Sequence, residues 1–115
     1  MNLSKEEALR LHRKMWSDMQ KEFGDCPSAG TRVEFKEDWC NSHGYKVRSD
    51  CFLCEYDYQV GGRSCKNCPI DWSSLSTNQL DRCYAEYKGV VNNVFDVAIF
   101  LAAPISEILA LPERK

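Results

Sequence analysis

Two pairs of cysteines in the middle of the chain have a spacing that suits metal binding. The first pair is Cys51 and Cys54, and the second is Cys65 and Cys68, so each has the form C-x2-C. Such a turn lets two thiolates converge on one ion, and two turns supply four sulfur ligands for tetrahedral Zn2+, at Zn–S distances of about 2.3 Å. Two consecutive glycines at 61–62 permit a reversal between the pairs. The sequence therefore predicts a structural zinc site.

Two other chemistries fit the same cysteines, namely two disulfides or free, redox-active thiols. A thioredoxin-like dithiol needs a C-x-x-C that leads a helix within a βαβ unit, and no strand pattern precedes Cys51. The chain has seven cysteines, an odd number, and its N-terminus runs into a charged helix rather than a signal-peptide pattern. We therefore expect a reducing cytoplasm, where clustered cysteines indicate metal rather than disulfides.

Four further residues form a candidate second metal site. Three cysteines and one histidine are a known structural zinc set, and the residues left over here are Cys26, Cys40, His43 and Cys83. Only Cys40 and His43 have a ligand-like C-x2-H spacing. The alternatives are that these cysteines are buried small side chains, or that Cys83 replaces one thiolate of the first site.

No arrangement of residues predicts catalysis. A site with four thiolates is closed and leaves no position for a reacting water. Cys40 and His43 could form a nucleophile pair, but a spacing of three residues is a weak signal. His12 lies at the edge of an apolar helix face, where a histidine is ordinarily not a ligand. We expect a protein that is not an enzyme, and a small metal-dependent enzyme is the weakest of the alternatives.

The elements that must hold these cysteines are mostly helical. Residues 3–23 predict an amphipathic helix that begins with a capping box formed by Ser4 and Glu7 and ends at Gly24. Trp16 widens its apolar face, which consists of Ala8, Leu11, Met15, Met19 and Phe23. Residues 25–30 predict a loop, and the short apolar pattern of 33–39, which ends at Trp39, fits either a strand or a short helix.

The alternation over residues 45–50 predicts a short strand that leads into the first cysteine pair. Helical character returns from residue 78, and residues 92–111 are the most apolar part of the chain. Two charged residues, Asp96 and Glu107, and the interrupting Pro104 argue against a membrane span. We expect a buried helix there, broken or kinked at Pro104 and packed on the first helix.

Together these patterns predict a single domain over residues 1–115. Its fold class is mainly α, as a small α+β protein. An N-terminal helix (1–24) and a C-terminal helical segment (76–115) pack around a central zinc-knuckle module (25–75) with little or no strand.

The charge of the chain gives no indication of nucleic-acid binding. Fifteen basic residues face 17 acidic ones, for a net charge of −2, whereas nucleic-acid binders usually carry a basic face. The alternative of a nucleic-acid-binding zinc-finger regulator depends on Lys46, Arg48, Arg63 and Lys66 near the knuckles, with Phe52 or Tyr56 to stack on bases.

The chain resembles small cysteine-rich proteins, mostly uncharacterised or described as zinc-binding, that are encoded by phages and prophages of Gram-positive bacteria. The resemblance covers most of the chain, and its most specific part is C-x2-C-E-Y followed by C-x2-C-P-x-x-W. It rests on His12 to Trp16, on Trp39 followed by His43 to Tyr45, on Cys51 to Tyr56, on Cys65 to Trp72 and on Ile108 to Arg114. It implies the four zinc ligands Cys51, Cys54, Cys65 and Cys68 and no catalytic residue. The long apolar run at 94–105 departs from it.

The resemblance and the closed metal site together favour a binding protein. We expect it to act in the bacterial host cytoplasm, where it binds and inhibits or modulates a host protein of the defence or transcription machinery. Aromatic residues are common anchors of interfaces, and the candidate binding residues are Tyr56, Tyr58, Trp72, Phe95 and Ile99. The apolar C-terminal helix is also a candidate surface for self-association.

Overall fold

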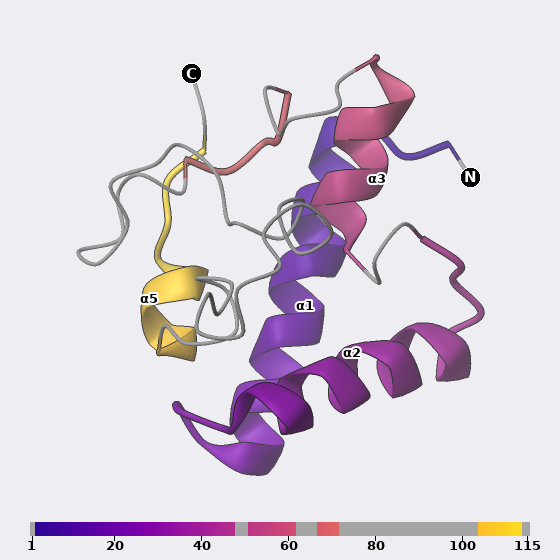
Figure 1. Cartoon of the computed structure of the whole chain (residues 1–115). Coiled ribbons are helices and arrows are strands. Elements are labelled where there is room, and N and C mark those ends of the chain that lie inside the picture. Colours follow the sequence, from indigo (N-terminus) through magenta and orange to yellow (C-terminus); the bar gives the residue numbers. More distant parts are fainter. Residues whose placement is uncertain (1, 48–50, 62–66, 72–103, 114–115) are drawn as a thin grey trace, which may run out of the picture.

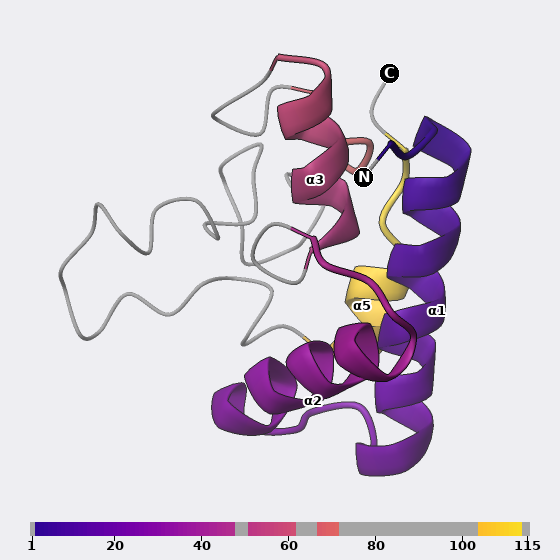
Figure 2. The same cartoon turned by 90° about the vertical axis from the view of Figure 1, so that its right-hand side faces the viewer.

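In the part of the chain that the structure describes, three helices are arranged around a long N-terminal helix. The computed structural model describes residues 2–47, 51–61, 67–71 and 104–113. The helices are α1 (Lys5–Phe23), α2 (Ala29–Ser42), α3 (Phe52–Gln59) and α5 (Ile105–Leu109). α3 and α5 pack on α1, and α2 crosses its C-terminal half (Figures 1 and 2). Within these residues the only β pairing is an isolated antiparallel bridge between Ile70 and Glu113. The mainly helical prediction is confirmed.

The ends of α1 are where the sequence predicts them. Ser4 Oγ accepts the Glu7 N–H at 3.0 Å, which satisfies one of the unpaired donors of the first turn. At the other end Gly24 takes φ 82°, a left-handed conformation that glycine adopts without strain, and its N–H donates to the Gln20 carbonyl.

The buried surface of α1 is wider than one stripe. Ala8, Leu11, Met15, Met19 and Trp16 are buried as predicted, but Leu9 and His12 are buried as well. α1 is covered on several sides because α2, α3 and α5 all contact it. The prediction that His12 lies at an edge is therefore wrong, since only 2% of it is exposed. Phe23, which was predicted to belong to the apolar face, is instead 47% exposed.

α2 resolves the ambiguity of residues 33–39 in favour of a helix. Its N-cap is Ser28, whose Oγ accepts the Thr31 N–H at 3.2 Å, so the predicted loop ends two residues earlier than expected. Trp39 is directed into the core and donates its indole N–H to Asp18 Oδ2 at 2.9 Å, which ties α2 to α1. The strand predicted over 45–50 is not present in its described part, because residues 45–47 have irregular backbone.

α5 begins directly after Pro104, where the break in the C-terminal apolar segment is predicted. Its N-terminus is capped by a residue distant in sequence: Asp25 accepts the Ser106 N–H at 2.7 Å and the Ser106 hydroxyl at 2.9 Å. Ile105 and Ile108 are buried, and the helix packs on α1 as predicted. The rest of the predicted C-terminal helical segment, residues 76–103, lies outside the described residues.

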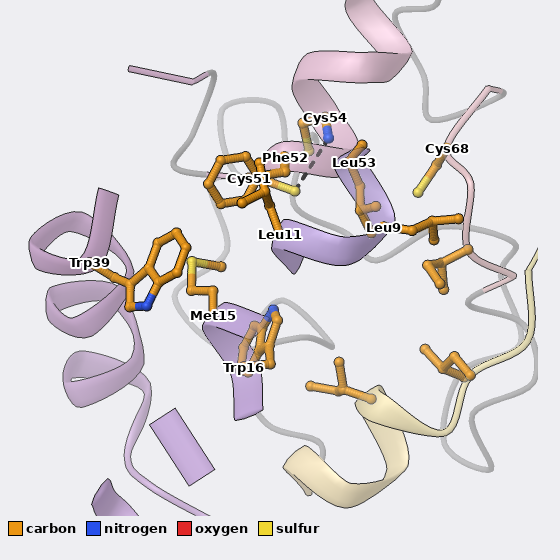
Figure 3. Close-up of a cluster of buried hydrophobic side chains, with 14 of the residues drawn as sticks. Leu9, Leu11, Met15, Trp16, Trp39, Cys51, Phe52, Leu53, Cys54 and Cys68 are labelled. Carbon is orange, nitrogen blue, oxygen red and sulfur yellow. Dashed lines mark hydrogen bonds between the residues drawn. The ribbon is translucent and has the colours of Figure 1, made fainter. Parts of the chain in front are cut away.

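One apolar cluster joins the four helices and the cysteines. It combines the buried face of α1 with Trp39, Phe52, Leu53 and the isoleucines of α5, and it includes Cys51, Cys54 and Cys68 (Figure 3). Phe52 lies between Trp39 and Tyr45, in edge-to-face contacts with ring centroids 5.8 Å and 5.2 Å apart. None of the helices in the described ranges is long and apolar enough to cross a membrane.

Candidate metal centre

The first cysteine pair stands at the N-terminus of α3. Cys51 is the N-cap residue, and its Sγ accepts the Cys54 N–H at 3.3 Å (Figure 3). A sulfur that accepts a backbone N–H three residues ahead suits a thiolate, because the donor and the helix dipole both stabilise negative charge. The sequence does not predict α3, whose first turn is the C-x2-C pair itself.

The surroundings of Cys51 favour its ionised form. They lower its pKa to about 6, chiefly through a hydrogen bond from the Cys54 side chain, while burial opposes the shift. The positive charge of Lys36 and the N–H groups of Cys54 and Leu53 add to the effect. Because metals bind thiolates rather than thiols, Cys51 is prepared as a ligand at neutral pH.

A buried carboxylate attaches the second cysteine pair to the same helix. Asp57 lies one turn after Cys54 on α3, is 1% exposed, and accepts the Asn67 N–H at 2.7 Å. Asn67 directly precedes Cys68, which is 4% exposed. Two residues further on, Ile70 pairs with Glu113, and the Asp71 N–H donates to the Pro112 carbonyl. The end of the second pair is therefore held between α3 and the C-terminal segment.

Three of the four predicted zinc ligands lie within the described residues, but these three do not form a metal-binding group there. Cys51 and Cys54 lie together, and Cys68 enters the same apolar cluster from a separate segment (Figure 3). Cys65 lies outside the described residues. Within the described ranges, no group of three or more potential ligands is close enough to hold a metal ion. The donor set fits zinc in type, and the full set of four ligands stays a prediction.

The candidate second site is not assembled in the parts of the chain described. Cys26 is exposed and Cys40 is buried. His43 stacks on Trp39 with ring centroids 3.9 Å apart, and its Nδ1 lies 2.8 Å from the Trp39 carbonyl oxygen. Because that oxygen can only accept, Nδ1 carries the proton in this contact and cannot bind a metal there. Cys83 lies outside the described residues.

The predicted partner-binding residues are only partly within the described chain. Tyr58 on α3 is 47% exposed, whereas Tyr56 is half-buried and packs against the core. Trp72, Phe95 and Ile99 lie outside the described residues. The predicted self-association helix, residues 92–111, is described only from Pro104 onward, where Ile105 and Ile108 are buried.

A groove between α1 and α2 was not predicted from the sequence. It has a volume of about 610 Å3, and the residues that define it are Asp18, Glu22 and Phe23 of α1 and Glu34, Phe35 and Asp38 of α2, with Trp39 and His43 at one end. We refer to it as the α1–α2 groove. The sequence does contain a signal for this groove: two pairs of acidic residues at i,i+4 spacing, Asp18 with Glu22 and Glu34 with Asp38, each beside a phenylalanine.

Comparisons with protein-family models, curated proteins and solved structures find no match for this chain.

Proposed function

We propose that the chain is a non-enzymatic binding protein that one zinc ion holds together in its middle segment. The observation that carries the proposal is the Cys51 cap, in which a buried sulfur with a lowered pKa accepts the Cys54 N–H. Such a sulfur is a preferred zinc ligand. In this proposal zinc is held by Cys51, Cys54, Cys65 and Cys68, and it fixes α3 and the segment that follows it.

Zinc in this role contributes to folding rather than to chemistry. Four thiolate ligands close the coordination sphere, so the ion has no position for a substrate or a reacting water. His12 is buried beneath other helices, and His43 is engaged with Trp39. A closed coordination sphere of this kind supports a binding function over an enzymatic one.

The proposed partner is a protein of the bacterial host, and the proposed place of action is the host cytoplasm. The resemblance to phage and prophage proteins supports this partner class, and binding would inhibit or modulate the host protein. Nucleic acid is a less favoured partner, because Arg32 and Lys36, the two basic residues of α2, are buried against the core rather than displayed.

Affinity capture from a bacterial lysate, followed by mass spectrometry, tests the proposal. The bait is the full chain, compared with Cys54→Ser, which removes a proposed ligand, and with Cys26→Ser, which removes an exposed cysteine outside the site. We expect one bacterial protein to be retained by wild type and Cys26→Ser and lost with Cys54→Ser. Retention of nucleic acid in place of a protein, with steep loss on added salt, would favour the alternative.

A further inference from the structure

We propose that the α1–α2 groove binds a lysine- or arginine-bearing segment of a protein partner. The inference rests on the proposed binding function and adds to it a surface and the chemistry of the partner. At about 610 Å3 the groove lies within the range of about 300–1,000 Å3 that is usual for ligand clefts. It lies where α2 crosses the C-terminal half of α1 (Figure 2).

The lining of the groove is aromatic. Phe23 and Phe35 meet edge to face, with centroids 5.9 Å apart and planes at 89°, and Phe23 is 47% exposed. Trp39 and the imidazole of His43 form a stacked pair at the other end. Aromatic surfaces attract cations, and they also take up the methylene stems of lysine and arginine.

Carboxylates from both helices surround these rings. Two carboxylates lie one turn apart on α1, namely Asp18 and Glu22. Two more lie one turn apart on α2, namely Glu34 and Asp38. Each pair therefore faces the groove from its own helix. No lysine or arginine belongs to the described lining. Lys14, which precedes Asp18 by one turn on α1, places its Nζ 3.6 Å from Asp18 Oδ2.

The basic residues of α2 are directed away from the groove. Arg32 and Lys36 are buried and lie over the Trp16 ring, at 5.9 Å and 6.0 Å from its centroid. Glu34 and Asp38 therefore line the groove, whereas the two cations of α2 lie against Trp16. The groove therefore presents carboxylates from both helices to a cationic side chain.

The arrangement selects a cationic segment over a metal ion. Within the described residues no three carboxylates or other ligands are close enough to chelate a metal. Carboxylates spread along two helices and separated by aromatic rings instead suit several cationic side chains on one chain. Arginine adds planar donors that pair with carboxylates in a fork.

Titration with a synthetic peptide tests the inference. The probe is a capped nine-residue peptide in which arginine alternates with glycine and serine, and its counterpart carries glutamate in place of arginine. The test variant is Glu34→Gln with Asp38→Asn, and the matched control is Glu6→Gln with Glu37→Gln, which removes the same charge from exposed positions outside the groove. Circular dichroism verifies that both variants fold.

We expect the arginine peptide to bind and the glutamate peptide not to bind. Two surface ion pairs correspond to a change of about 2- to 30-fold in affinity, so the test variant should weaken binding within that range while the control stays within about twofold. Amide shifts in a two-dimensional NMR spectrum should concentrate on α1 residues 18–23 and α2. Equal weakening by both variants, or no binding by wild type, would overturn the inference.

The bacterial protein retained in the affinity capture separates this inference from the proposed function. If that protein is retained by wild type but lost with Glu34→Gln/Asp38→Asn, both stand. If it is retained by both, the groove is not its docking site and the inference fails, while the binding function stands.

Discussion

Replacing Trp39 by phenylalanine tests how α2 is attached to α1. The indole N–H of Trp39 donates to Asp18 Oδ2 at 2.9 Å, and phenylalanine keeps a ring but loses the donor. A hydrogen bond to a charged group contributes about 1.5–3 kcal/mol. The Asp18 side chain is 30% exposed and retains Lys14 at 3.6 Å, so we expect a contribution at or just below the lower end of that range, about 1–1.5 kcal/mol.

A double-mutant cycle isolates this contribution from the loss of ring volume. Trp39→Phe, Asp18→Ala and the combined variant are unfolded in urea with excess zinc, and free energies of unfolding are compared. We expect a coupling energy of about 1–1.5 kcal/mol. Asparagine is avoided at residue 18 because its side-chain oxygen can still accept the indole N–H. A coupling energy below about 0.3 kcal/mol, which is within the scatter of independent sites, would refute the reasoning.

The same bond makes a signed prediction about pH. Donation by Trp39 is the largest cause that holds the pKa of Asp18 below its ordinary value. A lowered carboxyl pKa in the folded state stabilises the protein above the unfolded pKa of about 3.9, and this stabilisation disappears as the pH falls through the folded pKa. The difference in stability between wild type and Trp39→Phe should therefore shrink below about pH 4. A difference that grows on acidification would contradict the assignment.

Two further predictions concern residues that the structure places unexpectedly. Burial, with the charges of Lys36 and Arg13, lowers the pKa of His12 to about 3. Below about pH 6.5 the histidine of the unfolded chain takes up a proton that the folded chain does not. The free energy of unfolding should therefore fall as the pH is lowered from about 6.5 toward 3. The NMR resonances of the His12 ring should not titrate between about pH 8 and 5, and a midpoint near 6.5 would contradict its burial. Asp25→Ala should remove both hydrogen bonds to Ser106 and raise amide exchange in residues 105–111 before the rest of the chain, whereas the exposed-site control Glu37→Gln should not. Because Ser106 holds the pKa of Asp25 low, wild type should show the same local loosening only in acid, as the pH falls through the folded pKa.

The parts of the fold that local signals determine could be predicted from the sequence. Ser4, Glu7 and Gly24 delimit α1 because caps depend on residues a few positions apart. Pro104 marks the start of α5 for a similar reason, since proline fits before a helix but not within one.

The parts that tertiary contacts determine could not be predicted. The buried side of α2 includes Arg32 and Lys36, which lie against the Trp16 ring, so the helix shows no clear apolar period. α3 was missed because its first turn consists of the C-x2-C pair, which suggests a metal knuckle whether or not a helix follows. Asp25 caps α5 across a separation of 81 residues, a contact that no local pattern contains.

In the candidate metal centre and the groove, too, local spacing could be predicted from the sequence, whereas contacts between distant segments could not. Spacing alone predicted the ligand pair Cys51 and Cys54, and the structure places them together. The role of Asp57 in holding Asn67 against α3 could not be predicted, because a buried acid and a solvent-facing acid look alike in sequence. The α1–α2 groove likewise depends on the crossing of two helices.

Zinc content measured by native mass spectrometry tests the central claim most directly. The account predicts one zinc ion per chain in wild type and in Cys26→Ser, and none in Cys54→Ser. Structural zinc contributes on the order of 10 kcal/mol in small modules, so its removal by a strong chelator should loosen residues 45–72 first. A wild-type chain that carries no zinc, or whose thermal stability is unchanged after complete metal removal, would contradict the claim.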